Sequence, residues 1–307
     1  MTTRALRFSA GVMGVLWVAC LGLAAAAEPG LSVTLQSDRF SRTLSVGASA
    51  ALDLSNVSGD IEITGVVGDT IQIDARKSGN PALVDIEVSQ TGDRVRVETR
   101  YRGNRGPSVD FTVSVPSRTV VSVKSVSGDI DVRDVSGGVR AESVSGDVEV
   151  TNVGNLMLAK SVSGSLTIDA ATSPEELEIS SVSGDVSVTA LKAEGVSVES
   201  VSGEVRLTDV ACERASVESV SGDIHYGGQL ATSGRYEFQS HSGDVTLALA
   251  GDTGFELAAE TFSGEVSSDF PMTAGRLRGK DVHGVFGDGS AMIQASTFSG
   301  DISLTKN

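Results

Sequence analysis

The chain has 307 residues, a formal net charge of −16, and aromatic side chains at only 4% of its positions. This length fits one large domain. A strongly acidic surface repels phosphate backbones and anionic lipids, so nucleic acid is excluded as the expected partner. The scarcity of aromatic residues also disfavours a surface on which sugar rings stack.

The first 27 residues have the pattern of a secretory signal peptide. Arg4 and Arg7 precede an apolar stretch over residues 10–23, and three alanines stand before Glu28. The apolar stretch is too short to span a membrane. We therefore expect residues 1–27 to be removed and the mature chain to carry no transmembrane segment. Its expected location is the periplasm, the outer-envelope surface or the extracellular medium. Cys212 is then the only cysteine left, and we interpret it as a small buried or neutral thiol.

Residues 28–118 are expected to form an antiparallel β-region that caps a downstream repeat region. Strand-like segments alternate there with glycine-rich and proline-rich turn signals. The expected strands are Ile61–Ile63, Thr70–Ala75, Val84–Val88, Val95–Tyr101 and Val109–Val115. One early copy of the downstream repeat, Asn56–Asp60, lies within this region.

Residues 119–307 contain the motif Ser-Val-Ser-Gly-Asp/Glu, repeated with variations. Its glycines are mostly 18–21 residues apart, which is the spacing of one turn of a solenoid. The sequence therefore predicts an all-β fold, a parallel β-helix of about ten turns that we expect to be right-handed. The repeat glycines, which we expect to stand in one line, are Gly128, Gly146, Gly164, Gly184, Gly203, Gly222, Gly243, Gly264, Gly284 and Gly300.

Each turn shows strand periodicity on both sides of its glycine. Around Gly203, Val196 and Val198 alternate with polar residues, and so do Val205 and Leu207. These residues should stack from turn to turn as buried apolar rows. The step from Val198 to Val201 is three residues, so a buried Val201 requires a corner near residues 199–200. We expect this corner, with Val201 buried behind it.

The glycines allow two structural interpretations. Glycine either removes side-chain bulk where two sheets converge, or adopts a positive φ in a bulge. The sequence alone does not choose between them. Four residues before the glycines, Lys124, Glu142 and Lys160 alternate in sign and are expected to pair between turns.

The residue after each glycine is usually acidic, and stacking would bring like charges together. Either cations or local hydrogen bonds must then relieve the repulsion. We predict local hydrogen bonds, because one carboxylate per turn supplies too few oxygens for Ca²⁺. The weak calcium candidates are Asp129, Asp147, Asp185, Glu204, Asp223, Asp244 and Glu265.

A resemblance to a known family is carried by two segments. Residues 113–116 and 120–123 followed by Ser125–Ile130, together with Asn56–Ile63, resemble an uncharacterised bacterial family called putative adhesins. Its members are similar to the β-helical head domains of auto-transporter adhesins. The resemblance covers about residues 50–307. It implies a β-helix, export and a cell-envelope setting, and it brings no catalytic residues.

The sequence also lacks the motifs of common active sites. It has three histidines, His225, His241 and His283, and no paired-cysteine, HExxH or GxSxG motif. We therefore expect no enzyme activity, no catalytic or cofactor-binding residue, no metal site beyond the calcium candidates, and no cofactor. The expected function is an exported adhesin, scaffold or envelope-interaction module that binds an envelope or surface protein or a glycan. Two alternatives stay open, a β-helical carbohydrate-active lyase or hydrolase and an envelope rod that self-associates end to end through its C-terminal edge.

Overall fold

The computed structural model describes residues 38–306, except for residues 104–105, 252 and 274–279. The expected signal peptide, residues 1–27, lies outside the described residues. The elements are β1 (Arg39–Ser45), β2 (Ala51–Ser58), β3 (Ile61–Val66), β4 (Thr70–Ser78), the 3₁₀ helix η1 (Pro81–Leu83), β5 (Val84–Thr91), β6 (Arg94–Tyr101), β7 (Ser108–Pro116), β8 (Val120–Ser127), β9 (Ile130–Arg133), β10 (Gly138–Ser145), β11 (Val148–Val153), β12 (Asn155–Ser163), β13 (Leu166–Ser183), β14 (Val186–Thr189), β15 (Lys192–Ser202), β16 (Val205–Ser221), β17 (Ile224–Ser242), β18 (Val245–Leu249), β19 (Phe255–Ser263), β20 (Val266–Ser268), β21 (Asp281–Phe286), β22 (Ala291–Ser299) and β23 (Ile302–Lys306).

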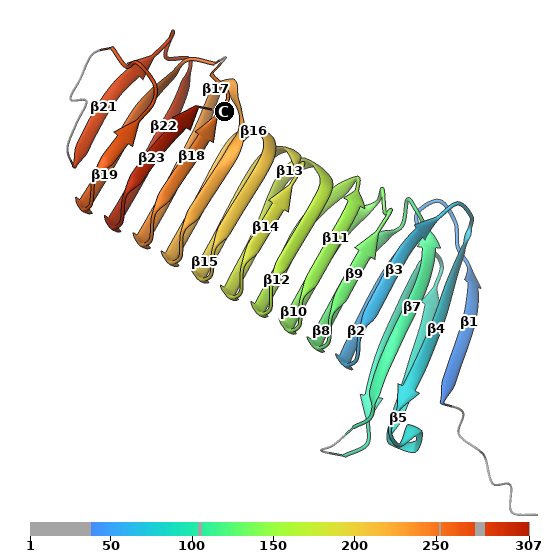
Figure 1. The fold of residues 1–307 in the computed structure, drawn as a ribbon. Coiled ribbons are helices and arrows are strands. Elements are labelled where there is room, and N and C mark those ends of the chain that lie inside the picture. Colours follow the sequence, from blue (N-terminus) through green and yellow to red (C-terminus); the bar gives the residue numbers. More distant parts are fainter. Residues whose placement is uncertain (1–37, 104–105, 252, 274–279, 307) are drawn as a thin grey trace, which may run out of the picture. The chain divides into compact units, whose positions relative to one another are not determined.

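The protein is all-β and solenoid-like, with two facing rows of parallel strands (Figure 1). Strands before a repeat glycine form the first row, in which β10 pairs with β8 and β12. Strands after the glycine form the second row, in which β11 pairs with β9 and β13. The long strands β13, β16 and β17 bend and contribute to both rows. Among the described residues, no helix is long and apolar enough to cross a membrane.

The core lies between the two rows and consists of the apolar rows expected from the sequence. In the turn of Gly203, Val198, Val205 and Leu207 are all at most 1% exposed. Their equivalents pair in register in neighbouring turns, as Val198 does with Ile179 and Val217. Backbone hydrogen bonds between the paired strands set the spacing of the turns, and the β-branched side chains of these rows pack closely on the pleated surface.

The repeat glycines satisfy both structural interpretations at once. Eight of the stacked glycines have a positive φ, for example +144° at Gly184 and +129° at Gly203. A Cβ added to Gly203 would also lie 2.3 Å from the carbonyl oxygen of Gly184 in the neighbouring turn. Glycine is therefore required by backbone conformation and by close approach. The stacked order is Gly59, Gly128, Gly146, Gly164, Gly184, Gly203, Gly222, Gly243, Gly300 and Gly264.

Gly284 does not belong to this stack, so its assignment as a repeat glycine is wrong. It lies in β21, which pairs with β19 in the antiparallel direction and places Gly284 opposite Leu257. The weak resemblance of Asp281–Val285 to the motif arises from strand alternation around a glycine, without the corner.

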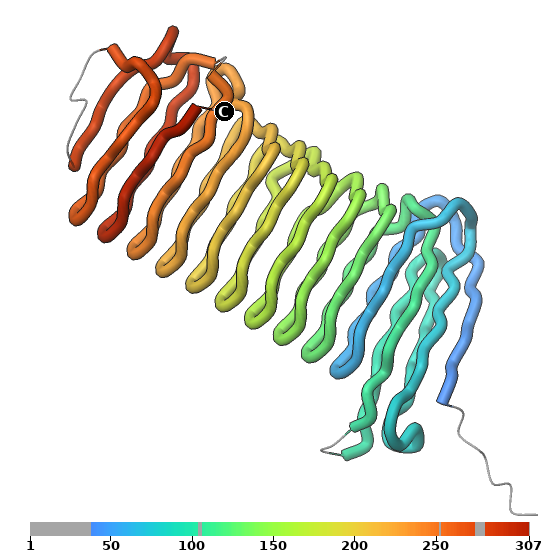
Figure 2. Tube along the Cα trace, viewed as in Figure 1, coloured from blue at the N-terminus to red at the C-terminus, as the bar shows by residue number. Residues whose placement is uncertain are grey.

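The last turns are not stacked in sequence order, as the chain trace in Figure 2 shows. Strand β22 lies between β17 and β19, and β23 lies between β18 and β20, with parallel pairing on both sides. The C-terminal strand is thus an internal strand with two partners. One alternative required end-to-end association through a free edge of the C-terminal strand. This strand has no free edge, because it pairs with β18 and β20.

The N-terminal part contains all five strands expected between residues 61 and 115. Strand β4 pairs antiparallel with β1 and β7, and β5 pairs antiparallel with β6. Parallel pairing nevertheless begins upstream of residue 119, because β2 and β3 pair with β8 and β9. The early motif copy therefore forms a turn of the stack, and β4–β7 form an excursion between it and β8.

The opposite corner of the turns also has a repeated backbone conformation. The sixth residue after five successive glycines has a φ between +51° and +59°. Asparagine and aspartate tolerate this left-handed region, whereas alanine is strained there. These residues are Asp134, Asn152, Ala170, Ala190 and Asp209.

Candidate functional site

The Ser-Val-Ser-Gly corner buries its first serine and exposes its valine. Ser200 is 5% exposed, whereas Val201 is 46% exposed. The prediction that Val201 is buried is therefore wrong. Strand β15 continues without a corner through residues 199–200 to Ser202, so ordinary alternation turns Ser200 inward and Val201 outward.

The buried polar side chains form a continuous serine row beneath this surface. Thr297 donates its hydroxyl hydrogen to the Gly243 carbonyl at 3.1 Å, and Thr261 donates to Gly300 at 2.9 Å. Hydroxyls thereby satisfy glycine carbonyls of the neighbouring turn. Within the described residues, the hydroxyls of Ser125, Ser143, Ser200 and Ser219 have no hydrogen-bond partner. The serine row comprises Asn56, Ser125, Ser143, Ser161, Ser181, Ser200, Ser219, Ser240, Thr297 and Thr261.

The outward residues of the same corner form an exposed apolar ladder along the stack. Its apolar members range from 39% exposed at Val162 to 67% at Phe262. Contiguous exposed apolar surface of this kind is typical of interaction sites. The apolar ladder comprises Val57, Val126, Val144, Val162, Val182, Val201, Val220, His241, Phe298 and Phe262.

The apolar ladder is not among the features expected from the sequence, although the sequence contains one signal of it. His241 replaces valine at this position, and Phe298 and Phe262 replace it in the two turns beyond. A tightly packed core row does not readily accept histidine, or the change in volume from valine to phenylalanine. An exposed row does accept both.

The three rings of the apolar ladder stack on one another. The centroids of His241 and Phe298 are 5.1 Å apart with an interplanar angle of 11°, and those of Phe298 and Phe262 are 4.8 Å apart at 5°. The Lys280 ammonium lies 5.7 Å from the Phe262 centroid and donates to the Phe262 carbonyl at 2.5 Å. Most ring faces are therefore covered by a neighbour, and the rings present their edges to solvent.

A groove runs between the apolar ladder and a second outward row, which we call the polar wall. The pairing register aligns the members of the polar wall from strand to strand. One section of the groove is a cavity of about 790 Å³, and the other is a cavity of about 420 Å³. The polar wall comprises Lys124, Glu142, Lys160, Ser180, Glu199, Glu218, Gln239, Ser296 and Glu260.

The two sections of the groove differ in charge. In the smaller section, Lys124 and Glu142 form an ion pair at 2.8 Å, which is one of the pairings expected from the alternating signs. In the larger section, the polar wall contains Glu199, Glu218 and Glu260 and no basic residue. We call these parts the mixed section and the acidic section.

The residues after the glycines form an acid row held by hydrogen bonds between turns. An aspartate carboxylate accepts from the backbone N–H of the next acidic residue along the stack. The distances are 2.9 Å from Asp147 to Asp129, 2.9 Å from Asp244 to Asp223, and 2.8 Å from Asp301 to Asp244. Local hydrogen bonds of this kind offset the repulsion within the row.

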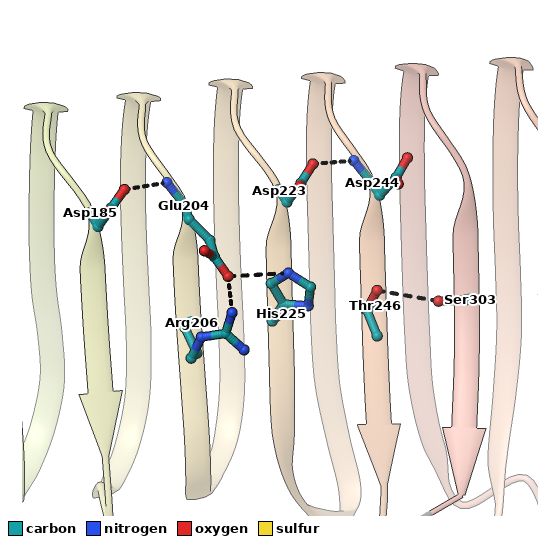
Figure 3. A network of polar contacts seen from close by, with 8 residues as sticks. All are labelled: Asp185, Glu204, Arg206, Asp223, His225, Asp244, Thr246 and Ser303. Carbon is teal, nitrogen blue, oxygen red and sulfur yellow. Dashed lines mark hydrogen bonds and ion pairs between the residues drawn. The ribbon is translucent and has the colours of Figure 1, made fainter.

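Glu204 departs from this arrangement (Figure 3). Its own N–H donates to Asp185 at 2.9 Å, but its longer side chain turns along the strand to Arg206 and His225. The distance from His225 Nε2 to Glu204 is 3.2 Å. The aspartate side chain therefore has the length that reaches the backbone N–H of the next turn. The longer side chain of Glu204 pairs with basic side chains on the sheet surface instead.

The structure places the seven weak calcium candidates in the same outward row, one to a turn. Several of their carboxylates are already used by backbone N–H groups, as Asp129, Asp185 and Asp223 show. Within the described residues, no group of three or more His, Cys, Asp and Glu side chains is arranged to hold a metal ion. His283 instead lies 3.0 Å from Asp281.

Cys212 lies in a buried cluster with two tyrosines. Its sulfur is 3.9 Å from the Tyr226 hydroxyl, and Tyr236 donates its hydroxyl hydrogen to the Cys212 carbonyl at 2.7 Å. Burial raises the pKa of the Cys212 thiol to about 11. The thiol is therefore neutral at pH 7 and poorly nucleophilic.

The fold and its corner define an all-β, solenoid-like protein with an exposed groove along one edge. The Toastrack DUF4097 family matches residues 84–305, and the chain belongs to this family. This match confirms the resemblance to an uncharacterised family that was expected from the sequence. No curated protein matches the chain.

Several solved structures are similar to this one. A putative adhesin from Bacteroides fragilis is 14% identical, with 87% of this chain and 96% of that chain covered and a TM-score of 0.45. A putative adhesin from Parabacteroides distasonis is 12% identical, with the same coverage and a TM-score of 0.38. A putative cell adhesion protein from Clostridium sporogenes is 12% identical over 88% of this chain and 100% of that chain, with a TM-score of 0.26. At these levels the likeness concerns the fold alone.

Proposed function

We propose that the chain is an exported, non-enzymatic solenoid that serves as an adhesion or envelope-interaction module. The observation that carries this proposal is the apolar ladder. Valines and phenylalanines that would normally be buried stand exposed in turn after turn, at one edge of a groove. Such a surface is costly to leave in water and is typical of a site that a partner covers.

A binding role is also supported by the way the carboxylates are used. The acid row has the abundance of carboxylates that a glycan-cleaving enzyme needs, but its aspartates accept backbone N–H groups from the next turn. A carboxylate in that position contributes to the fold. The leader-like pattern of residues 1–27 supports export.

The test is co-sedimentation of the purified mature chain with envelope fractions of the producing cells. The variant Val201→Ser/Val220→Ser/Phe298→Ser removes apolar surface from side chains that are 46–50% exposed, so it should fold normally. We expect wild-type protein to sediment with envelopes and the variant to remain in solution. A matched control replaces Ser187, Ser197 and Ser216, which lie outside the groove lining, with threonine. Equal sedimentation of wild type and groove variant would contradict the proposal.

A further inference from the structure

The acidic section of the groove combines two surfaces with different chemistry. On one side stands the apolar ladder from Val182 to Phe262, and on the other stands the polar wall with Glu199, Glu218 and Glu260. We propose that this section binds a segment of a partner protein in which Lys or Arg residues are combined with apolar residues. This inference rests on the proposed function and names the chemistry of the partner.

Among the described residues, no basic side chain pairs with the polar wall of this section, and the Lys280 ammonium lies at its end, over Phe262. Glu199 and Glu218 are directly paired across neighbouring strands, where like charges destabilise a sheet. Within the described residues, Glu199, Glu218 and Glu260 form no ion pair, whereas Glu142 in the mixed section is paired with Lys124. Basic side chains of a ligand would relieve the repulsion and gain charge-assisted hydrogen bonds.

The apolar side of the groove favours aliphatic contacts over sugar stacking. The faces of Phe298 are covered by His241 and Phe262, and Lys280 lies over Phe262. Sugar rings stack on open aromatic faces, which these rings do not offer. Their edges and the valine methyls fit apolar side chains and the aliphatic stems of Lys and Arg.

The net charge of the chain excludes several other possible occupants of the groove. With a net charge of −16, a second copy would bring more carboxylates to an acidic groove. Nucleic acids and anionic membranes are repelled for the same reason. The polar wall of this section extends over six strands, from Ser180 to Glu260, or about 24 Å at about 4.8 Å per strand. That length accommodates about seven residues of extended peptide.

Fluorescence anisotropy with labelled eight-residue peptides tests this inference on the mature chain. The probes are a Lys/Leu peptide, the same peptide with Glu for Lys, one with Gln for Lys, and one with Ser for Leu. We expect saturable binding of the Lys/Leu peptide alone, weakened at least tenfold from 50 to 300 mM sodium chloride. Equal binding of the Glu or Gln peptide would overturn the charge requirement, and equal binding of the Lys/Ser peptide would overturn the apolar requirement.

Two variants locate the site. Glu199→Gln/Glu218→Gln should weaken the Lys/Leu peptide about tenfold, and Val220→Ser/Phe298→Ser should weaken it to a similar degree. The matched control, Glu178→Gln/Glu256→Gln, removes two exposed carboxylates outside the groove lining and should change affinity less than twofold. Equal loss in the control would show general attraction to an acidic protein and overturn the site.

The two proposals fail in different ways. If envelope sedimentation depends on Val201, Val220 and Phe298 but no Lys/Leu peptide binds, the partner chemistry is wrong and the interaction function stands. If the peptide binds in the groove but envelope sedimentation does not need those residues, the envelope role is wrong and the peptide site stands.

Discussion

The middle of the solenoid and its C-terminal end are built from the same motif but stacked differently. From β8 to β17, each turn lies on the turn that precedes it in sequence. At the C-terminal end, β22 is inserted between β17 and β19. The corner is nevertheless unchanged, because a Cβ on Gly300 would lie 2.2 Å from the Gly243 carbonyl, as in the regular turns. The motif therefore specifies contact with a turn of the same type, and not with one particular turn.

The lengths of the connections between strands determine the order in which the turns stack. Two residues separate β14 from β15, so the chain reaches only the next position in the stack. Five residues separate β18 from β19, and a longer excursion through β21 returns the chain to β22. Longer connections allow a turn to be skipped and filled later.

The largest expected effect comes from charge in the core of either region. Ile302→Asp and Val205→Asp should each lower the free energy of unfolding by about 3–5 kcal/mol, because both side chains are 0% exposed and the new carboxylate has no partner. Chemical denaturation measures both. The control Ser197→Asp, on the outward face, should cost less than about 1 kcal/mol. A cost for Ile302→Asp near that of the control would mean that β23 behaves as a frayed end.

The repeat glycines should be equally intolerant in both regions. Gly203→Ala and Gly300→Ala should each cost about 2–3 kcal/mol, because the added Cβ meets a carbonyl oxygen at 2.3 or 2.2 Å and both φ angles are positive. Gly195→Ala is the control, since its Cβ would lie 3.4 Å from the nearest atom. It should change stability by no more than about 0.5 kcal/mol. Thermal unfolding of the three variants would separate these outcomes.

The Cys212 cluster, at the junction of the two regions, should make stability fall at alkaline pH. The pKa of Cys212 is raised from 9.0 to about 11, so its contribution is complete below pH 9 and is lost as the pH rises from 9 to 11. The full loss is about 2–3 kcal/mol. Comparing wild type with Cys212→Ala at pH 8 and pH 10.5 isolates this group from the tyrosines. Parallel losses in the two proteins would contradict the assignment.

Removing backbone strain at the corner opposite the repeat glycines, in the middle of the solenoid, should increase stability. Ala190 has a φ of +54°, which costs alanine about 1–2 kcal/mol and glycine almost nothing. Ala190→Gly also gives the unfolded chain more freedom, at about 0.4–1 kcal/mol. We therefore expect a net gain of up to about 1 kcal/mol in thermal unfolding. A loss of stability would show that packing around this methyl group outweighs its backbone strain.

The smallest expected effect is that of calcium. The acid row follows the stacked order through both regions, and its aspartate carboxylates accept backbone N–H groups, for example at 2.8–3.0 Å from Asp60, Asp129 and Asp244. Millimolar calcium should then raise the melting temperature no more than sodium chloride of equal ionic strength does. A larger shift that saturates with calcium concentration would indicate specific sites in the row.

Many of the strands and the inward rows of the repeat turns could be predicted from the sequence. Alternation identified Ile61–Ile63, Thr70–Ala75 and the inward rows around Gly203, because a half-buried strand places every second residue in the core. The glycine spacing gave the turn length. Local periodicity does not contain the stacking order, since the turn of Gly300 fits equally well on any corner of its kind.

The groove could not be predicted because valine is usually buried, and the valines of the motif were therefore expected in the core. Placing Val201 inward required a corner at residues 199–200, but an unbroken strand needs none. The structure buries Ser200 instead, in a row of which some members, such as Thr261 and Thr297, donate to glycine carbonyls of other turns. The Ser200 hydroxyl itself has no hydrogen-bond partner among the described residues. A rule based on hydrophobicity alone cannot anticipate that carbonyl groups at a tight corner need a donor.

The inserted position of β22 and β23 has a consequence for how the protein acquires its structure. Synthesis proceeds from the N-terminus, so β19 and β20 leave the ribosome before the strands that separate them from β17 and β18. Until those strands arrive, β19 has no parallel neighbour, and it could pair directly with β17 through the same corner motif. To reach the final arrangement, the chain must either leave the position between β17 and β19 empty until β22 arrives, or form a β17–β19 pairing and break it later. The C-terminal end of the solenoid should therefore be the last part to fold.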